Sequence, residues 1–129
     1  MMIAFLLAMA AQAGSVMPSE EPTHLPGDIP RNVTPRDQNA PQFSLDIEDY
    51  PAEALRNHWE GVSEIAILVD EQGRGIACEV VHSSGHDVLD RATCSIAIRK
   101  IRFKPATDKD GYPIKSIFDP LRIAWRLPA

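Results

Sequence analysis

Hydrophobic and polar residues alternate with the period of a β-strand in the middle of the chain. In SEIAILVD (63–70), Ile65, Ile67 and Val69 fall on one side of an extended backbone, and the residues between them fall on the other. The polar turn DEQGRG follows, and IACEVVHS (76–83) returns as a second run rich in β-branched residues. This pattern predicts a β-hairpin.

Helical signals flank the hairpin on both sides. PAEALRNHWEG (51–61) begins with a proline suited to a first helical turn and ends at a glycine, the usual punctuation of a helix. DVLDRATCSIAIRKI (87–101) carries Leu89, Ala92 and Ile96 at helical spacing. We therefore expect one helix before the hairpin and another after it.

The chain ends in an extended segment, IKSIFDPLRIAWRL (114–127). Pro120 inside it has no backbone N–H to donate, so this strand is expected to lie at a sheet edge or to carry a bulge. The predicted folded part, residues 49–129, therefore has the order helix, strand, strand, helix, strand.

Two segments of different character precede the folded part. Residues 1–13, MMIAFLLAMAAQA, form an uncharged apolar run with small residues where a signal peptidase reads. The run is shorter than the roughly 20 apolar residues of a membrane span. We expect a cleaved secretory signal; a short uncleaved anchor or a misplaced start is the alternative.

Residues 14–48 carry a proline every four to six positions, which predicts an extended, disordered tether.

Charge is unevenly distributed along the chain. The six acidic and two basic residues of the tether account for most of the net charge of −5, so the folded part is nearly neutral. It lacks the basic excess typical of nucleic-acid binders. One basic cluster consists of Arg99, Lys100, Arg102 and Lys104. It is interpreted as a solvated helix end, or as a docking surface for an acidic partner or an anionic cell-envelope polymer.

The stretch SSGHDVLDRATC (83–94) contains the residue types of a hydrolase or metal site. A catalytic triad needs its three side chains to converge in space, but Ser84, His86 and Asp87 are almost adjacent, without a Gly-x-Ser-x-Gly elbow. The neighbouring histidines and Cys78 lack the spacing of metal ligands. Ser84 and Asp87 instead resemble a capping box. We expect a helix cap here, and no catalytic residue, metal or cofactor.

Cys78 and Cys94 are the only cysteines of the chain. An isolated pair in one exported domain usually forms a disulfide, which would stabilise the fold by roughly 3 kcal/mol. Two buried, unpaired thiols are the alternative.

Several segments together resemble one known family. YPAEALRNHWEG, LVDEQGRG, VVHSSGHDVLDRATC and IRFKPATDKDGYPI occur in the order and spacing of the TonB C-terminal domain family, and the resemblance covers about residues 49–127. It implies an α+β fold, with a small antiparallel sheet packed against two helices, and no enzymatic activity. The cysteine pair resembles a family variant in which the second strand and the second helix are cross-linked.

The resemblance also implies a binding surface at the last strand. Family members couple the inner-membrane proton-motive complex to outer-membrane receptors, and a receptor segment, the TonB box, adds as a strand beside this one. An exposed edge offers unpaired N–H and C=O groups for that purpose. The corresponding positions here are Leu121, Arg122, Ile123, Ala124, Trp125, Arg126 and Leu127. The partner would be an outer-membrane receptor or another envelope protein, and neither a nucleic acid nor a small-molecule substrate.

The N-terminal segment departs from the energised members of the family, which keep a transmembrane helix that contacts the proton-driven motor. Our leading hypothesis is therefore an exported, periplasmic domain that binds a partner by strand addition. If the N-terminus is retained or begins further upstream, an energy transducer anchored in the inner membrane and facing the periplasm is the alternative. A third hypothesis is an assembly module that forms a homodimer through the same edge. A secreted enzyme or inhibitor would need a cleft constellation that the sequence does not show.

Overall fold

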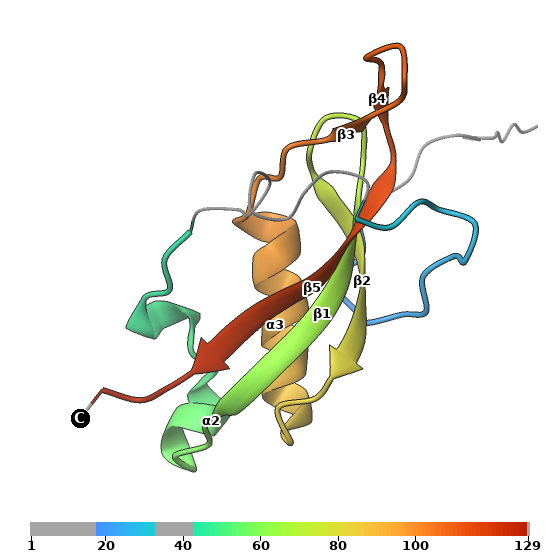
Figure 1. The fold of residues 1–129 in the computed structure, drawn as a ribbon. Helices are drawn as coiled ribbons and strands as arrows, with labels where there is room; N and C mark the ends of the chain where they lie inside the picture. The colour runs from blue at the N-terminus through green and yellow to red at the C-terminus, as the bar shows by residue number, and fades with distance from the viewer. Residues whose placement is uncertain (1–17, 33–42, 129) are drawn as a thin grey trace, which may run out of the picture.

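A computed structural model describes residues 18–32 and 43–128 of the chain (Figure 1). The expected signal peptide (1–13) and two parts of the expected tether (14–17 and 33–42) lie outside the described residues. The elements are the 3-10 helix η1 (Ile47–Asp49), α2 (Ala52–Arg56), β1 (Gly61–Val69), β2 (Gly75–His82), α3 (Asp87–Arg99), β3 (Ala106–Thr107), β4 (Pro113–Ile114) and β5 (Ser116–Trp125).

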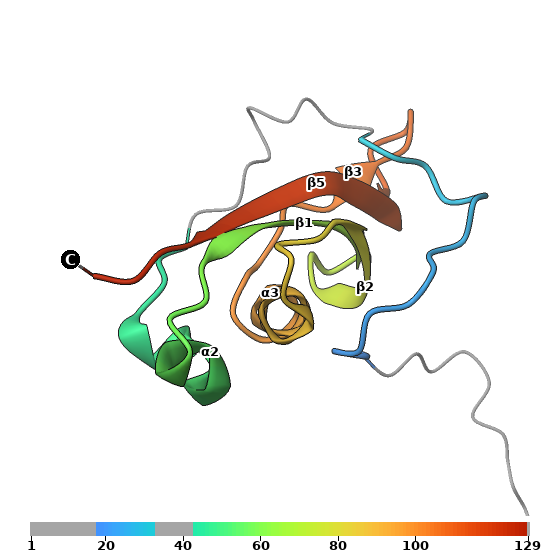
Figure 2. The ribbon, with the colours of Figure 1, turned by 90° about the horizontal axis from the view of Figure 1, so that it is seen from below.

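The three long strands form one antiparallel sheet in the order β2-β1-β5. Helix α3 packs along one face of this sheet, and the short helix α2 lies beside it (Figure 2). The α+β fold expected from the family resemblance is thereby confirmed. The short strands β3 and β4 pair separately in the connection before β5; of their residues, only Ile114 lay in the extended segment that the sequence predicted.

Helix α2 is shorter than its sequence predicts. It ends at Arg56, and His58 soon afterwards adopts a φ of +54°, a left-handed conformation that a continuing helix does not contain. The chain then turns into the sheet, so Gly61 is the first residue of β1 and does not close the helix.

The turn between β1 and β2 is held by one buried carboxylate. Asp70 accepts hydrogen bonds from the backbone N–H groups of Gln72 and Arg74, both at 2.9 Å, and from the Arg74 Nε at 2.9 Å. Gly73 has a φ of +82°, and a Cβ there would collide with the carbonyl oxygen of Phe103. Only glycine fits this close approach, so the turn sequence fixes where the hairpin folds back.

The main core lies between the sheet and α3. Ile65 and Ile67 of β1 point into it together with Leu89 and Ile96 of α3, as their periodicities predict. A disulfide joins Cys78 of β2 to Cys94 of α3, with 5.8 Å between the two Cα atoms. The expected cross-link between the second strand and the second helix is therefore confirmed.

Pro120 lies where the sequence placed it, in a strand at the edge of the sheet. Leu121 pairs with Ile65 and Phe118 pairs with Ile67, so two residues of β5 stand opposite the single residue Ala66. This is a β-bulge, which accommodates a residue that cannot donate to the ladder. Both consequences expected of Pro120 are present in the structure.

The opposite face of the sheet is covered by residues 18–32, which we call the strap. The strap is extended, and Leu25 within it is 2% exposed in a cluster with Ala66, Leu68, Ile76 and Ile117. The proline-rich composition of this segment predicts a tether separate from the folded part, and its packing differs from that expectation. The reason is that β1 is apolar on both sides, and α3 covers only one of them.

Candidate partner-binding edge

The second half of β5 alternates between buried and exposed side chains. Leu121, Ile123 and Trp125 are buried in the core, whereas Arg122 and Ala124 are exposed. In the described part of the chain, no strand other than β1 pairs with this half of β5. It can therefore offer a partner its outer backbone groups and the exposed side chains.

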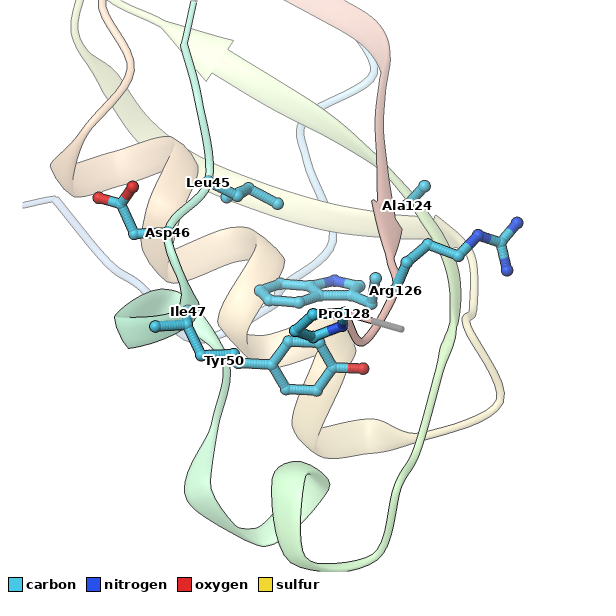
Figure 3. Close-up of a pocket in the computed structure, with 8 residues that line it drawn as sticks. Leu45, Asp46, Ile47, Tyr50, Ala124, Arg126 and Pro128 are labelled. Carbon is cyan, nitrogen blue, oxygen red and sulfur yellow. The ribbon is translucent and has the colours of Figure 1, made fainter.

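A pocket of about 260 Å³ lies at the C-terminal end of β5. One wall comes from the segment before α2, and the other comes from the end of β5 and the residues after it (Figure 3). The lining residues are Leu45, Asp46, Ile47, Tyr50, Ala124, Trp125, Arg126 and Pro128. The pocket is thus largely apolar, with one acidic and one basic residue among those that line it.

An aromatic pair forms the rigid part of this pocket. The rings of Tyr50 and Trp125 meet edge to face, with centroids 5.2 Å apart. The Tyr50 hydroxyl donates a hydrogen bond to the carbonyl oxygen of Trp59, and the Trp125 Nε1 donates to Thr93 Oγ1 at 2.9 Å. Burial, with a smaller contribution from the carboxylate of Glu60, raises the pKa of Tyr50. Tyr50 therefore remains a neutral donor. The two rings form the floor of the pocket, and a hydrogen bond holds each of them in place.

The stretch 83–94 does not form a catalytic constellation. The Ser84 Oγ lies 3.1 Å from the backbone carbonyl oxygen of His86 and accepts from the backbone N–H of the same residue. The His86 ring stacks on Trp59 with a centroid distance of 4.6 Å. Since the imidazole is directed at an indole and the hydroxyl at the backbone, these side chains do not form the serine–histidine contact of a triad. Among residues 18–32 and 43–128, no group of three potential metal ligands occurs.

The predicted capping pair is corrected by the structure. The N-cap of α3 is His86, which makes no side-chain capping bond, and Asp87 is the first residue of the helix. Ser84 lies two residues before the N-cap, too early for its hydroxyl to reach the free N–H groups of the first turn.

Asp90, which lies in the family-like segment VVHSSGHDVLDRATC but was given no role of its own, organises this loop. The residue is 5% exposed, and its carboxylate accepts hydrogen bonds from the Ser83 hydroxyl at 2.5 Å, the Ser84 N–H at 2.8 Å and the Ser63 hydroxyl at 3.1 Å. The available signals were its place in that segment and its position directly after Leu89 on the predicted helix. Asp90 therefore connects β1, the loop and α3.

Two residues of the basic cluster form ion pairs with acidic residues of the same chain. The Lys100 ammonium lies 2.9 Å from the carboxylate of Asp49, and this hydrogen bond is the main reason why the pKa of Asp49 is lowered. The Arg99 Nε lies 3.5 Å from the carboxylate of Glu20 in the strap. Arg102 pairs through its backbone with Arg74, and Lys104 is exposed. Docking of an anionic partner at these four residues remains a prediction.

No helix within the described residues has the length and apolar character of a membrane span. Comparison with curated proteins finds no match. A protein-family model described as "Gram-negative bacterial TonB protein C-terminal" matches residues 48–127, which span all the long strands and both α-helices. The chain therefore belongs to the TonB C-terminal family, whose members are periplasmic, non-enzymatic domains of envelope transport in Gram-negative bacteria.

Proposed function

We propose that this chain is an exported periplasmic protein that binds an extended segment of an outer-membrane receptor, or of another envelope protein, in TonB-dependent transport. The segment would add as a strand along Leu121–Leu127. The observation that carries this proposal is the position of β5, a terminal strand of the sheet whose second half ends beside a preformed pocket. Backbone pairing would supply affinity, and the pocket would supply selectivity.

The pocket favours one kind of side chain on the partner. An added strand that runs along Ala124 and Arg126 would bring every second side chain over the wall of the pocket. The floor of Tyr50 and Trp125 suits an apolar or aromatic group. Asp46 and Arg126 line the same pocket and could pair with polar neighbours of that group.

The disulfide supports an oxidising compartment for this function. Cys78 and Cys94 are joined, and such bonds persist in the bacterial periplasm but are rare in the cytosol. This agrees with the export that the N-terminal sequence predicts.

Peptide binding tests the proposal directly. The probes are synthetic peptides that copy the periplasm-facing N-terminal segments of Gram-negative outer-membrane receptors, and isothermal titration calorimetry measures their affinities. Ala124→Trp should weaken binding about tenfold or more, a loss of about 1.4 kcal/mol, because the indole fills the pocket and crowds the edge. Thr107→Trp, which places the same indole at an exposed position of β3, is the matched control.

Three results would count against strand addition at β5. They are equal binding by the wild type and Ala124→Trp, equal losses in both tryptophan variants, or no binding by any peptide. In the last case, a concentration-dependent dimer that Ala124→Trp disrupts would favour the self-association hypothesis instead.

A further inference from the structure

The strap connects the two edges of the sheet. It begins beside β2, where the Ser19 N–H donates to the carbonyl oxygen of Ile76 at 3.0 Å and the Thr23 N–H donates to that of Cys78 at 2.7 Å. It then passes around the β2 edge to the face opposite α3 and ends near β5 (Figure 2). The chain therefore pairs with its own sheet edges through a segment that precedes the family domain.

At β5 the strap uses the same kind of backbone contact that an added strand would use. The Ile117 N–H donates to the carbonyl oxygen of Pro30, and the Ile117 carbonyl accepts from the Asn32 N–H, both at 2.8 Å. The Asn32 side-chain oxygen accepts from the Asp119 N–H at 3.1 Å, and the Arg31 guanidinium lies 2.8 Å from the Asp119 carboxylate. The first half of the β5 edge is thus occupied by the chain itself.

Among residues 18–32, only one side chain is buried. Leu25 is almost completely buried, and its N–H donates to the carboxylate of Glu79 at 3.2 Å. Burial of a leucine contributes about 1.5–3 kcal/mol. The ion pairs between Glu20 and Arg99 and between Glu21 and Arg91 are exposed at the surface, where such pairs contribute little. Leu25 is therefore the one fully buried side-chain anchor of the strap, beside its backbone hydrogen bonds at β2 and β5 and the ion pairs of His24 with Glu79 and of Arg31 with Asp119.

A segment with one buried side chain can detach while the rest of the fold stays intact. Most other strap side chains are exposed or only partly buried, whereas the main core is closed by α3 and a disulfide on the other face. Segments with few buried contacts open at a much lower free energy than the global unfolding of their domain.

We propose that the strap is a displaceable, intrachain competitor at the β5 edge. A partner strand that extends past Pro120 toward Ile117 binds only after residues 30–32 have left this edge. This inference rests on strand addition as the proposed function. It adds that the chain restricts access to its own binding strand.

Amide hydrogen exchange, followed by NMR on the full chain, tests whether the strap detaches by itself. Leu25→Asp removes the anchor and places a carboxylate beside Glu79, so the exchange rate of the Ile117 amide should rise about tenfold or more. Arg31→Ala should raise it less, and Gly27→Ala, where a Cβ meets nothing within 4 Å, should leave it unchanged. The Ile65 and Ile67 amides should keep their protection in every variant. An unchanged Ile117 amide, or loss of protection at Ile65 and Ile67 as well, would overturn the proposal.

Peptide binding tests the competition. Two lengths of the same receptor peptide are used, one of about five residues and one of about ten, which at about 3.3 Å per residue extends past Pro120. Leu25→Asp should bind the long peptide about tenfold more tightly than the wild type does, and the short one equally. A synthetic peptide copying residues 18–32, added in trans, should reverse the gain.

The possible failures are distinguishable. Equal affinity of both proteins for the long peptide overturns the competition and leaves the proposed function intact. Failure of every peptide to bind either protein overturns the proposed function together with the competition. If Leu25→Asp raises the affinity for the short peptide as much as for the long one, the competition is also overturned, because the strap would then not act at the first half of β5.

Discussion

At the scale of single residues, the buried carboxylate of Asp90 holds β1 and the loop before α3 together. Burial is the largest influence on its pKa and acts to raise it, but the hydrogen bonds from Ser83, Ser84 and Ser63 together lower the pKa below its ordinary value of 3.8. The native carboxylate thus binds its proton less readily than the unfolded one does. Its stabilising contribution is complete above the unfolded pKa and is lost as the pH falls below 3.8.

Asp90→Asn should lower the free energy of unfolding at pH 7 by about 2 kcal/mol, because hydrogen bonds to a charged group are replaced by weaker or mismatched ones. Urea unfolding across a pH series is the measurement. The difference in the free energy of unfolding between wild type and variant should narrow as the pH falls below 3.8. Asp87→Asn, at an exposed position one turn earlier, is the control and should change stability by at most about 1 kcal/mol, because it removes only an exposed pair with Arg91 and a charge at the helix N-terminus. A gap that persists unchanged at low pH would contradict this account.

A second prediction at this scale concerns Gly73. Its φ of +82° and the closeness of the Phe103 carbonyl oxygen leave no space for a side chain. Gly73→Ala should therefore destabilise the fold by about 1–3 kcal/mol through backbone strain. Thermal unfolding measures this, with Gly27→Ala as the control; equal melting temperatures would show that the turn relaxes freely.

At the scale of elements, the sequence predicts the long strands and the long helix well, because their apolar periodicity and their burial agree. Pro120 is informative because its missing N–H restricts it to an edge or a bulge, and it occupies both. The strap was not foreseen as part of the fold, since a proline-rich, acidic composition indicates disorder. The uninterrupted apolar run of β1 was an available signal that both faces of the sheet need cover.

The disulfide makes a testable contribution at this scale. Its two cysteines are 16 positions apart, so breaking it should cost roughly 3 kcal/mol in the chain-entropy account. The double variant Cys78→Ala with Cys94→Ala should melt correspondingly lower than the wild type, and reductant should lower the melting temperature of the wild type alone. A reductant effect of the same size on the double variant would contradict this assignment.

At the scale of the whole molecule, the folded unit is larger than the match to the family. The match begins at residue 48, yet the strap lies between residues 18 and 32 and covers an apolar cluster on the sheet. Pro120 predicted from the residues alone that this strand lies at a sheet edge, but the use of that edge as a binding surface was predictable only through the resemblance. The pocket was not predictable, because it forms between Tyr50 and Trp125, which are remote in the sequence.

Removal of the strap should expose this cluster. A chain that begins at residue 43 should melt about 5 °C or more below one that begins at residue 18, because burial of Leu25 is lost. It should also self-associate more readily through its uncovered face, as measured by light scattering. Equal melting temperatures and equal molar masses for the two chains would show that the strap does not stabilise the fold.

The bulge at Asp119 and Pro120 also constrains the sequence of any partner. Ile117 points toward the strap while Leu121 points toward α3, although the two are an even number of residues apart. The inward and outward positions are therefore out of phase on the two sides of the bulge. A regular strand matches only one side, over about five residues or roughly 17 Å. A partner that matches both must itself consist of two short β-runs separated by a glycine, a proline or an extra residue, a pattern by which receptor sequences can be searched.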